Sequence, residues 1–435
     1  MQLSSYMKIF PDDDHPERRL VFSTRTAAVA SVSVLTLRSI ENGNFPARIE
    51  NQLTRLGFLT SNPEQERQSV LGFFDRFNAG SKTLSIMVLL NLDCNFACPY
   101  CFEGEMKGNL YMSDQTAENL VEFAREKFDS DKQHLVVDFY GGEPLLSPRL
   151  LRHLVREFRS LAESRGGTFR FNLVTNGSLL TRKMADSLVP LGLQSVKITL
   201  DGPAEIHNRY RPFKTGAGSF ETLLANIRAV SDQVTVRIGG NYLESTFKTF
   251  PDLLDELVRQ GITPDTVHSV KFDPVVNDPD GNPSGSGCHL GCTSPHEPWV
   301  DQASMYLREE ILKRGYNTSK PATVACLVEK RDAFVVNFNG DVYKCPAFVG
   351  KPDFCIGNIE SGVNGAADSY RLGVWKNDTC KACEYLPLCM GGCRYMTYLN
   401  NRCIEKPDCK REHFDTVLES YIKQDLRYRP AQRLR

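Results

Sequence analysis

An alternation of short β-rich runs with amphipathic stretches, from residue 85 onward, is the feature that most constrains this fold. The alternation is typical of a parallel sheet whose strands are joined by helices. Six such runs predict six strands, which begin at Ser85, Leu135, Phe169, Ser195, Val234 and Ser269. We therefore predict an α/β fold with a six-stranded open βα barrel. Functional groups in such barrels gather at the C-terminal ends of the strands.

Three cysteines, Cys94, Cys98 and Cys101, follow the first predicted strand in the run CNFACPYC. This C-x3-C-x2-C spacing predicts an iron–sulfur site, because three thiolates bind three irons of a 4Fe–4S cluster and leave the fourth iron open. The open iron could chelate S-adenosylmethionine (SAM) and pass an electron into its sulfonium, which would yield a 5′-deoxyadenosyl radical. Zinc is the alternative, but a structural zinc usually takes four ligands. No Cys or His follows Cys101 within thirty residues.

The other predicted strands also end in polar residues or glycines. These ends are Gly141-Gly142-Glu143-Pro144, Thr175-Asn176-Gly177, Asp201-Gly202 and a position near Asn241. Each alone is an ordinary turn. Glycines let a ligand approach the backbone, and the Glu143 carboxylate could pair with the ammonium of a methionine group. Taken together at successive strand ends, these residues predict one site.

Composition limits the partners and the compartment. The 435-residue chain is long enough for two to three domains, and its net charge of -1 favours neither nucleic acid nor an anionic membrane as partner. It contains no apolar run of eighteen residues and no signal-peptide layout at its N-terminus, so we expect a cytoplasmic protein. In that reducing compartment the fourteen cysteines are expected to be metal ligands rather than disulfides.

A second cysteine array lies near the C-terminus, mixed with glycines and the predicted strand pair AFVVNF and DVYKC. Its seven thiols are Cys326, Cys345, Cys380, Cys383, Cys389, Cys393 and Cys409. Seven thiols exceed what one tetrahedral site uses, so two metal centres are predicted. Two zinc ions, which would need eight ligands, are the alternative. Cys288 and Cys292 are either redox-active or free thiols, and Cys403 is expected to be a spare.

The first eighty residues predict a hairpin, YMKIF and RRLVFSTR, followed by two short helices in VSVLTLRSIENG and PARIENQLTRLGFL. This order suggests a winged-helix-like module. The segment has no basic recognition face, which argues against DNA binding. A structural cap over the barrel is the alternative to a binding role.

Residues 83 to 280 resemble the radical SAM enzymes, on the cysteine run, the GGEP segment and the other strand ends. The resemblance implies that Cys94, Cys98 and Cys101 hold a SAM-binding 4Fe–4S cluster and that Tyr100 lies beside the adenine. It also implies the remaining SAM contacts, which are Gly141, Gly142, Glu143 and Pro144 for the methionine group and Asn176, Asp201 and Asn241 for the ribose or carboxylate.

The C-terminal spacing resembles the SPASM extension of peptide- and protein-modifying radical SAM enzymes. This resemblance implies two auxiliary 4Fe–4S clusters, and so three clusters in all. Their ligands would be Cys380, Cys383, Cys389 and Cys409 in one cluster and Cys326, Cys345 and Cys393 in the other. The second set is one ligand short, so either Cys355, Cys288 or Cys292 completes it or the iron stays open for a substrate thiolate.

By this resemblance we expect a radical SAM/SPASM peptide maturase, with geopeptide-type maturases as the suggested subgroup. Its expected partners are a ribosomally made precursor peptide, whose leader adds a strand to the N-terminal module, and a ferredoxin or flavodoxin reductant. A thioether cross-link is the favoured product and a carbon–carbon link comes next.

Two alternatives remain. Anaerobic sulfatase-maturing enzymes share this layout, but they place a catalytic Asp after the cysteine corresponding to Cys345, where this chain has Pro346. An iron–sulfur electron-transfer protein would not need the aligned strand ends. The expected domains are a module at 1–82, the barrel at 83–290, a linker at 291–320, the SPASM domain at 321–415 and a tail at 416–435.

Overall fold

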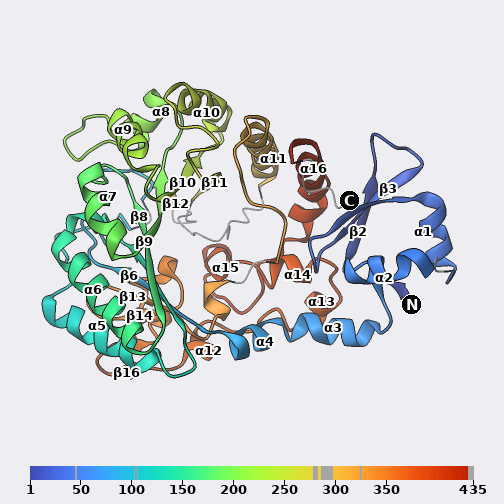
Figure 1. Ribbon diagram of the computed structural model, residues 1–435, viewed down its shortest axis with the longest axis horizontal. Coiled ribbons are helices and arrows are strands. Elements are labelled where there is room, and N and C mark those ends of the chain that lie inside the picture. The colour runs from blue at the N-terminus through green and yellow to red at the C-terminus, as the bar shows by residue number, and fades with distance from the viewer. Residues whose placement is uncertain are drawn as a thin grey trace. The chain divides into compact units, whose positions relative to one another are not determined.

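The computed structural model describes residues 1–44, 47–101, 103–104, 106–277, 283–285, 297–323 and 326–429. Cys288 and Cys292 lie outside these residues. The chain forms two compact units, coloured along the sequence in Figure 1. The first, here called the terminal unit, contains Met1–Ala79, Lys320–Glu329 and Gly373–Arg435; the second, the barrel unit, contains Gly80–Ser319 and Lys330–Leu372.

The barrel unit is built on a nine-stranded sheet of order β12-β11-β10-β9-β8-β7-β6-β13-β14. The six predicted strands are all present, and each is parallel to its neighbours among the six. They are β6 (Thr83–Leu89), β7 (His134–Tyr140), β8 (Thr168–Thr175), β9 (Leu193–Thr199), β10 (Thr235–Tyr242) and β11 (Ser269–Asn277). The predicted α/β fold with an open parallel sheet is confirmed.

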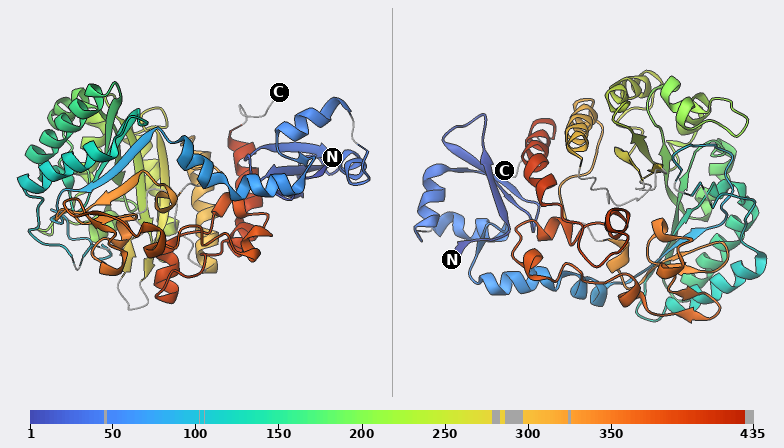
Figure 2. Two further views of the ribbon diagram at one scale, coloured as in Figure 1. Left: turned by 90° about the horizontal axis from the view of Figure 1, so that it is seen from below. Right: turned by 180° about the vertical axis from the view of Figure 1, so that it is seen from behind.

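Helices connect these strands and line the outer face of the curved sheet (Figures 1 and 2). They are α5 (Asp114–Lys127), α6 (Pro148–Ser164), α7 (Arg182–Leu188), α8 (Ala204–Tyr210), α9 (Phe220–Val230) and α10 (Phe250–Arg259). Short 3-10 turns precede or follow some of them at η1 (Pro144–Leu146), η2 (Val189–Leu191) and η3 (Phe247–Thr249). Helix α6 shows the reason for this packing, since its buried Leu151, Leu154 and Phe158 recur at helical spacing on one face.

The two faces of the parallel sheet differ in polarity. Strand alternation buries Val137 and Phe139 of β7 and places Asp138 on the opposite face. There Asn172 of β8 donates a hydrogen bond to Asp138 at 2.7 Å. Ser195 of β9 in turn donates to Asn172 at 2.7 Å. The inner face is therefore polar rather than a packed apolar core, as suits a barrel that admits a ligand.

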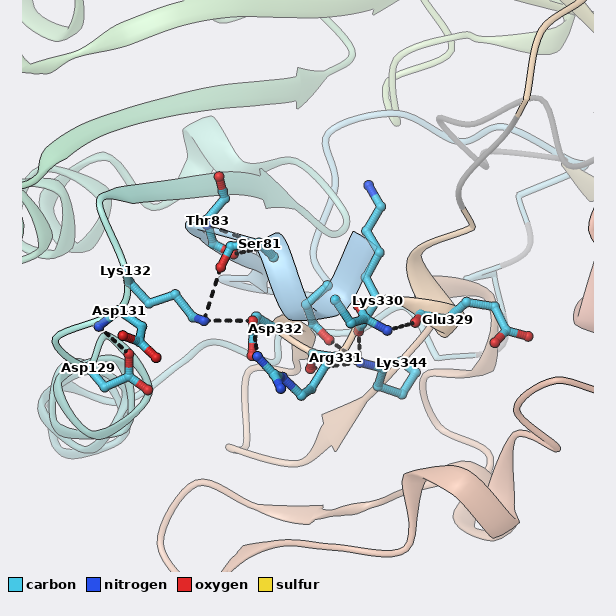
Figure 3. A network of polar contacts seen from close by, with 12 residues as sticks. Ser81, Thr83, Asp129, Asp131, Lys132, Glu329, Lys330, Arg331, Asp332 and Lys344 are labelled. Carbon is cyan, nitrogen blue, oxygen red and sulfur yellow. Dashed lines mark hydrogen bonds and ion pairs between the residues drawn. The ribbon is translucent and has the colours of Figure 1, made fainter. Parts of the chain in front are cut away.

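The predicted strand pair near residue 340 extends this sheet. Strand β13 (Ala333–Val336) lies parallel beside β6, and β14 (Val342–Tyr343) pairs with β13. A buried ion pair, Lys132 to Asp332 at 2.8 Å, ties the residue before β13 to the barrel (Figure 3). The ammonium of Lys344 donates to the carbonyls of Lys330 and Ala333. The sequence analysis assigned this segment to the C-terminal domain, but pairing with β6 makes it part of the barrel unit.

The predicted linker at 291–320 contains a helix, α11 (Pro298–Lys313). Its Val300, Leu307 and Ile311 are buried. Just after the helix, Arg314 forms an ion pair with Asp255 of α10 at 2.6 Å. Sequence composition suggested a connector, whereas an amphipathic pattern allowed this segment to pack onto the barrel.

The remaining elements of the barrel unit are short. They are β12 (Pro283–Gly285), β15 (Gly357–Asn358), β16 (Gly362–Val363), η5 (Pro346–Phe348), η6 (Pro352–Phe354) and α12 (Ala366–Ser369). Strand β12 pairs antiparallel with β11, and β15 with β16. Segments this short have few backbone hydrogen bonds of their own, so side-chain contacts must hold them in place.

The terminal unit begins with the predicted hairpin, β2 (Met7–Pro11) and β3 (Arg18–Ser23), followed by a third strand that was not predicted, β4 (Val29–Ser33). The two predicted helices are present. The N-terminal elements that complete this part are α1 (Val34–Glu41), α2 (Ala47–Arg55), the pair β1 (Gln2–Leu3) and β5 (Leu59–Thr60), α3 (Pro63–Leu71) and α4 (Phe73–Gly80).

Both faces of this small sheet are covered. Val21 packs with Leu37 of α1 and Leu53 of α2, while the next residue, Phe22, packs with Leu418 and Ile422 of the last helix. That helix, α16 (Arg411–Tyr428), covers most of the predicted tail. The N-terminal module and the C-terminal helix thus share one core. The other C-terminal elements of this unit are η4 (Leu327–Glu329), α13 (Asp378–Lys381), α14 (Leu386–Cys389) and α15 (Arg394–Asn401).

None of the helices in the described part of the chain is both long and apolar enough to cross a membrane.

Candidate active site

A pocket lies at the C-terminal ends of the six parallel strands. Its lining includes the three cysteines and five further residues predicted from the sequence, Tyr100, Gly141, Gly142, Asn176 and Asn241. Glu103, Lys107 and Arg211, which were not predicted, also line it. Three predicted residues, Glu143, Pro144 and Asp201, are not in the lining but lie directly behind it.

The three cysteines are held by hydrogen bonds within their own loop. The Cys94 amide donates to Asp93 Oδ1 at 2.8 Å, and the Phe96 amide donates to Cys94 Sγ at 3.4 Å. Burial raises the pKa of all three thiols, and the charge of Lys107 opposes this at each. No three Cys, His, Asp or Glu side chains of the described residues converge on a single ion. Three thiols that line one pocket suit a cluster, in which each thiolate binds a different iron.

Gly141 and Gly142 let the cysteine loop approach the end of β7. Gly141 has φ +115°, and a Cβ at this position would lie 2.4 Å from the carbonyl oxygen of Asn91. At Gly142 a Cβ would lie 1.9 Å from the carbonyl oxygen of Asp93. We expected these glycines to admit a ligand to the backbone. In the structure they also admit the neighbouring chain, so any side chain here would displace the loop that carries the cysteines.

The carboxylate of Glu143 is fully buried and bonds to two residues that line the pocket, Thr175 and Asn176. Thr175 Oγ1 donates to both of its oxygens, at 2.8 and 2.9 Å. The amides of Asn176 and Leu145 donate to it at 2.8 and 3.0 Å. Burial raises its pKa against these donors. Through these bonds the carboxylate joins the ends of β7 and β8. Its pairing with the ammonium of a methionine group stays a prediction.

Asn176 joins the end of β8 to the cysteine loop. Its amide donates to Asn95 Oδ1 at 2.7 Å and approaches Cys94 Sγ at 3.7 Å. Ser178 donates back to Asn176 Oδ1 at 2.7 Å, and Asn95 donates to Ser178 at 2.8 Å. This closed ring of hydrogen bonds fixes the orientation of the Asn176 amide beside Cys94.

Tyr100 and Asn241 both donate to the carboxylate of Asp201, and a residue that the sequence did not indicate, Arg211, adds a further contact. The Tyr100 hydroxyl donates to Asp201 Oδ2, while Arg211 donates to that hydroxyl at 2.8 Å. The backbone amide of Asn241 donates to Asp201 Oδ1 at 2.7 Å. Burial raises the pKa of Asp201, and the Arg211 guanidinium opposes this. Asp201 therefore links the three predicted SAM contacts into one buried network, which Arg211 joins through Tyr100 and Asp201.

His207 supports this network through hydrogen bonds to Asp201 and Ser219. It is fully buried, its Nδ1 accepts from the amide of Asp201 at 3.2 Å, and its Nε2 lies 3.0 Å from Ser219 Oγ. Ser219 donates its hydroxyl proton to the Arg211 carbonyl at 2.7 Å, so Nε2 must carry the imidazole proton. Burial lowers the pKa of His207 well below its ordinary value, and the charge of Arg211 lowers it further. The imidazole is therefore neutral.

Glu103 and Lys107 follow the cysteine run closely in the sequence. This proximity is the one sequence signal that could have indicated that they line the pocket. Glu103 is 3% exposed, and burial raises its pKa to about 7, against the opposing charge of Lys107. Burial alone would lower the pKa of Lys107, but the three thiols, led by Cys101, raise it above its ordinary value. His207 and Arg211 carry no comparable signal, because they belong to an unremarkable stretch around α8.

The second cysteine array is divided between the units. Cys380, Cys383, Cys389 and Cys409 all lie in the terminal unit. Burial raises the pKa of Cys380, and the charges of Cys383 and Cys409 raise it further. Burial also raises the pKa of Cys389 to about 12, with added effects of Cys380 and Cys383. The structure thus brings these four thiols into one neighbourhood.

The backbone around this array is unusual. Met390, Gly391 and Gly392 all have positive φ, at 43°, 84° and 70°. A Cβ at Gly392 would lie 2.2 Å from the carbonyl oxygen of Asp408, and the Cys393 amide donates to Asp408 Oδ2 at 3.1 Å. These contacts draw the CMGGC segment against the residue before Cys409.

The other predicted ligands do not all belong to one unit. Cys326 and Cys393 lie in the terminal unit, and Cys345 lies in the barrel unit, so their grouping stays a prediction. Pro346 is buried and begins η5 directly after Cys345. Cys355, a candidate fourth ligand, donates to the carbonyl of Gly357 at 3.2 Å. Cys403 is exposed.

Comparison with known proteins agrees with this geometry. Residues 89–262 match the family model of the Radical SAM superfamily. The serine-type anaerobic sulfatase-maturating enzyme of Bacteroides thetaiotaomicron is 25% identical over 362 residues, which cover 72% of this chain and 83% of the relative. The chain contains a radical SAM domain, which indicates a radical SAM enzyme.

Two solved structures show the same fold as this radical SAM enzyme. Native anSMEcpe with bound AdoMet and Kp18Cys peptide aligns with a TM-score of 0.59 and 18% identity, over 80% of this chain and 99% of the other. SuiB of Streptococcus suis bound to S-adenosylmethionine aligns with a TM-score of 0.53 and 14% identity, over 93% of this chain and 98% of the other.

Radical SAM enzymes use SAM and a 4Fe–4S cluster, and the pocket residues suit both. Three thiols line one pocket, which is the donor set that such a cluster requires. Two buried polar atoms of the lining residues, Glu103 Oε1 and Arg211 Nε, have no hydrogen-bond partner within the described residues. An acceptor and a donor of this kind suit a ligand that carries both an ammonium and hydrogen-bond acceptors.

Proposed function

We propose that this radical SAM enzyme is a peptide maturase that installs a cross-link in a precursor peptide, with a Cys-to-carbon thioether as the product. Its reductant would be a cytoplasmic ferredoxin or flavodoxin. The observation that supports a peptide substrate is the strand edge of β4 in the N-terminal sheet, which is suited to pair with an added strand. A relative also supports it, because the similar anSMEcpe structure holds a peptide.

The two edges of the sheet β2-β3-β4 differ in chemistry. Strand β2 contains Lys8 and Pro11, and Lys8 pairs with Glu384 at 3.4 Å and with Asp415 at 3.5 Å. Charges and proline on an edge strand discourage strand addition. Strand β4 reads VASVS, with neither charge nor proline, and all five residues are partly exposed. Of the two edges, β4 is therefore the one suited to accept a peptide strand.

The hydrogen-bond register shows which groups of β4 are available. The Ser23 amide donates to the Ala28 carbonyl at 2.9 Å, and the Val34 amide donates to the Glu17 carbonyl at 2.9 Å. In an antiparallel pair these bonds recur at alternate residues, so Ala30 and Val32 pair with β3. The amides of Val29 and Ser31 then point away from β3, where a leader strand would bind.

In the barrel, the residues of this chain hold and orient the cofactors. Cys94, Cys98 and Cys101 would hold the cluster, and the pocket lined by Gly141, Gly142 and the Tyr100 network would hold SAM. When bound, this pair supplies the abstraction of a hydrogen atom from a substrate carbon.

The thioether rests on two features of the auxiliary cysteines. Pro346 has no proton acceptor where sulfatase-maturing enzymes place the catalytic Asp. The predicted set of Cys326, Cys345 and Cys393 is one thiol short of four, and an iron site of this kind prefers a soft thiolate to a hydroxyl. Closing the link would transfer one hydrogen atom from carbon to the 5′-deoxyadenosyl radical, release the thiol proton and pass one electron to an auxiliary cluster. The product would therefore be about two hydrogens lighter than the precursor.

Co-expression with a short cysteine-bearing peptide encoded beside this gene tests the proposal. Mass spectrometry should show a loss of two hydrogens, a cysteine that resists alkylation and a link that survives reductant. A matched pair of variants tests the leader site. Ser31→Pro removes the outward amide together with the hydroxyl, while Ser31→Ala keeps the amide and removes the hydroxyl with its bonds to Arg18 and Asp12. Peptide binding should fall for Ser31→Pro alone, with SAM cleavage unchanged in both.

Sulfatase maturation is the second candidate, favoured by the 25% identical Bacteroides relative. The same mass spectrum separates the two. Formylglycine in a sulfatase-derived peptide would establish this second reaction. An unmodified cysteine beside a new carbon–carbon link would refute the thioether and retain a peptide maturase.

A further inference from the structure

We propose that metal bound by Cys380, Cys383, Cys389 and Cys409 fixes the position of the N-terminal strands β2 and β3, with Glu384 as the positioning residue that connects the two regions. The inference rests on metal binding at these four cysteines and does not depend on the peptide reaction proposed above. It starts from contacts between the N-terminal strands and the segment around α13 and α14, all within the terminal unit.

Two apolar clusters connect this segment to the N-terminal residues. Cys383 packs against a cluster that contains Phe22 of β3 together with Tyr385. Cys380 packs against a second cluster, which contains Tyr6, the residue directly before β2. Each of these two predicted ligands therefore contacts a cluster that includes the N-terminal module. A metal centre that fixes both sulfurs would hold the two clusters in one arrangement.

Glu384, the residue after Cys383, adds polar contacts to the same strands. Its carboxylate pairs with Lys8 of β2 at 3.4 Å and with Arg411 of α16 at 3.2 Å. Its carbonyl accepts a hydrogen bond at 2.6 Å from the hydroxyl of Thr24, which follows β3. The charge of Cys383 is the main cause of the raised pKa of Arg411, so the guanidinium lies near that thiol. Glu384 thus connects β2 and the end of β3 to the surroundings of a predicted metal ligand.

The segment that makes these contacts has little backbone support of its own. Helices α13 and α14 contain four residues each, and isolated helices shorter than about 12 residues are marginal in water. The positive φ angles of the CMGGC segment follow directly. Four thiols in one neighbourhood are the donor set of a 4Fe–4S cluster or of a zinc ion. Metal binding would therefore stabilise this segment and, through its contacts, the N-terminal strands.

Hydrogen exchange of the full-length protein tests the connection, measured after reconstitution with iron and sulfide and again after chelation. The amides of β2 and β3 should exchange about tenfold faster in the chelated protein, while those of β7 should not change. Two exposed cysteines assign the effect to this site. Cys409→Ala removes a predicted ligand and should give the same increase, whereas Cys403→Ala removes a spare thiol and should give none.

Glu384→Gln tests the positioning residue. In the iron-loaded variant the amides of β2 should exchange about fivefold faster than in the loaded wild type, because the carboxylate no longer pairs with Lys8 and Arg411. Iron content and the protection of residues 378–383 should equal those of the wild type. In the chelated protein the same substitution should have no effect, since the segment is then no longer fixed. Glu412→Gln, at an exposed position of α16, should change none of these quantities.

Three results would overturn the proposal. Equal exchange of β2 and β3 in loaded and chelated wild type would mean that apolar packing alone positions these strands. Faster exchange after chelation but not in Cys409→Ala would assign the effect to another metal site. An equal effect of Glu384→Gln in loaded and chelated protein would make Glu384 a purely structural residue. If Glu384→Gln loses iron, Lys8→Met gives the same comparison from β2, because it removes the ammonium and keeps an unbranched apolar side chain.

Discussion

The two cysteine arrays of this enzyme are supported in different ways. Cys94, Cys98 and Cys101 lie on one short loop, which hydrogen bonds and close glycine contacts fasten to the ends of long parallel strands. The C-terminal array lies among four-residue helices such as α13 and α14, and its members belong to two units. The first array is therefore positioned by the fold, whereas we predict that the segments of the second are held in place by bound metal.

The contrast reflects how each region satisfies the hydrogen-bonding groups of its backbone. Strands β6 to β11 satisfy one another's amides along a continuous sheet. The CMGGC segment instead contains three successive residues with positive φ, which cost backbone entropy or strain and yield few regular hydrogen bonds. Metal binding that accompanies folding can stabilise such a segment, because the site does not exist in the unfolded chain.

Replacing Cys94, Cys98 and Cys101 with Ala should give the largest effect. SAM cleavage should be abolished, and about four of about twelve irons should be lost. Production of 5′-deoxyadenosine and analysis of iron and sulfide measure both. Cys403→Ala, at an exposed spare thiol, should change neither. A triple variant that still cleaves SAM would show that the pocket is not the radical site.

Removing bound metal should affect hydrogen-exchange protection differently in the regions of the two cysteine arrays. In chelated apo-protein, hydrogen exchange should increase strongly around residues 378 to 409, while β6 to β11 keep their protection. Exchange measured by mass spectrometry on loaded and apo-protein gives the comparison. Equal loss of protection in both regions would mean that the barrel also needs its cluster to fold.

Gly142→Ala tests how the fold positions the first array. A Cβ would lie 1.9 Å from the Asp93 carbonyl oxygen, so the cysteine loop must move. We expect a loss of about 1 to 3 kcal/mol in unfolding free energy, together with incomplete loading of the SAM-binding cluster. Gly80→Ala is the matched control, because a Cβ at Gly80 would meet nothing within 4 Å. Normal iron loading in Gly142→Ala would contradict the proposed contact.

Because His207 is buried and neutral, we predict that the unfolding free energy of the barrel unit depends on pH. Burial holds its folded pKa well below the ordinary 6.5, so its stabilising effect is complete above pH 6.5 and is lost as the pH falls below that value. The loss should approach about 1.4 kcal/mol per pH unit. Denaturant unfolding of wild type and His207→Gln between pH 7.5 and 5 measures it, with a shallower slope expected for the variant. Parallel slopes would mean that another group is responsible.

Much of the barrel was predictable because its signals are local. Each strand run is continuous in the sequence, and the polar residues that end it are its immediate neighbours. The GGEP segment, Asn176 and Asn241 could therefore be assigned to one site by the rule for parallel strands. The same reasoning did not predict that Thr175 donates to Glu143, because this contact depends on the register between β7 and β8.

The sequence by itself determined the class of chemistry, since cysteine spacing and strand periodicity are properties of short segments. Tertiary structure alone decided that β13 extends the barrel sheet, that α16 shares a core with the N-terminal strands, and that Arg211 and His207 support the site. Each of these rests on contacts between residues far apart in the chain. Such contacts are selected by packing and backbone pairing over the whole fold, and no local pattern records them.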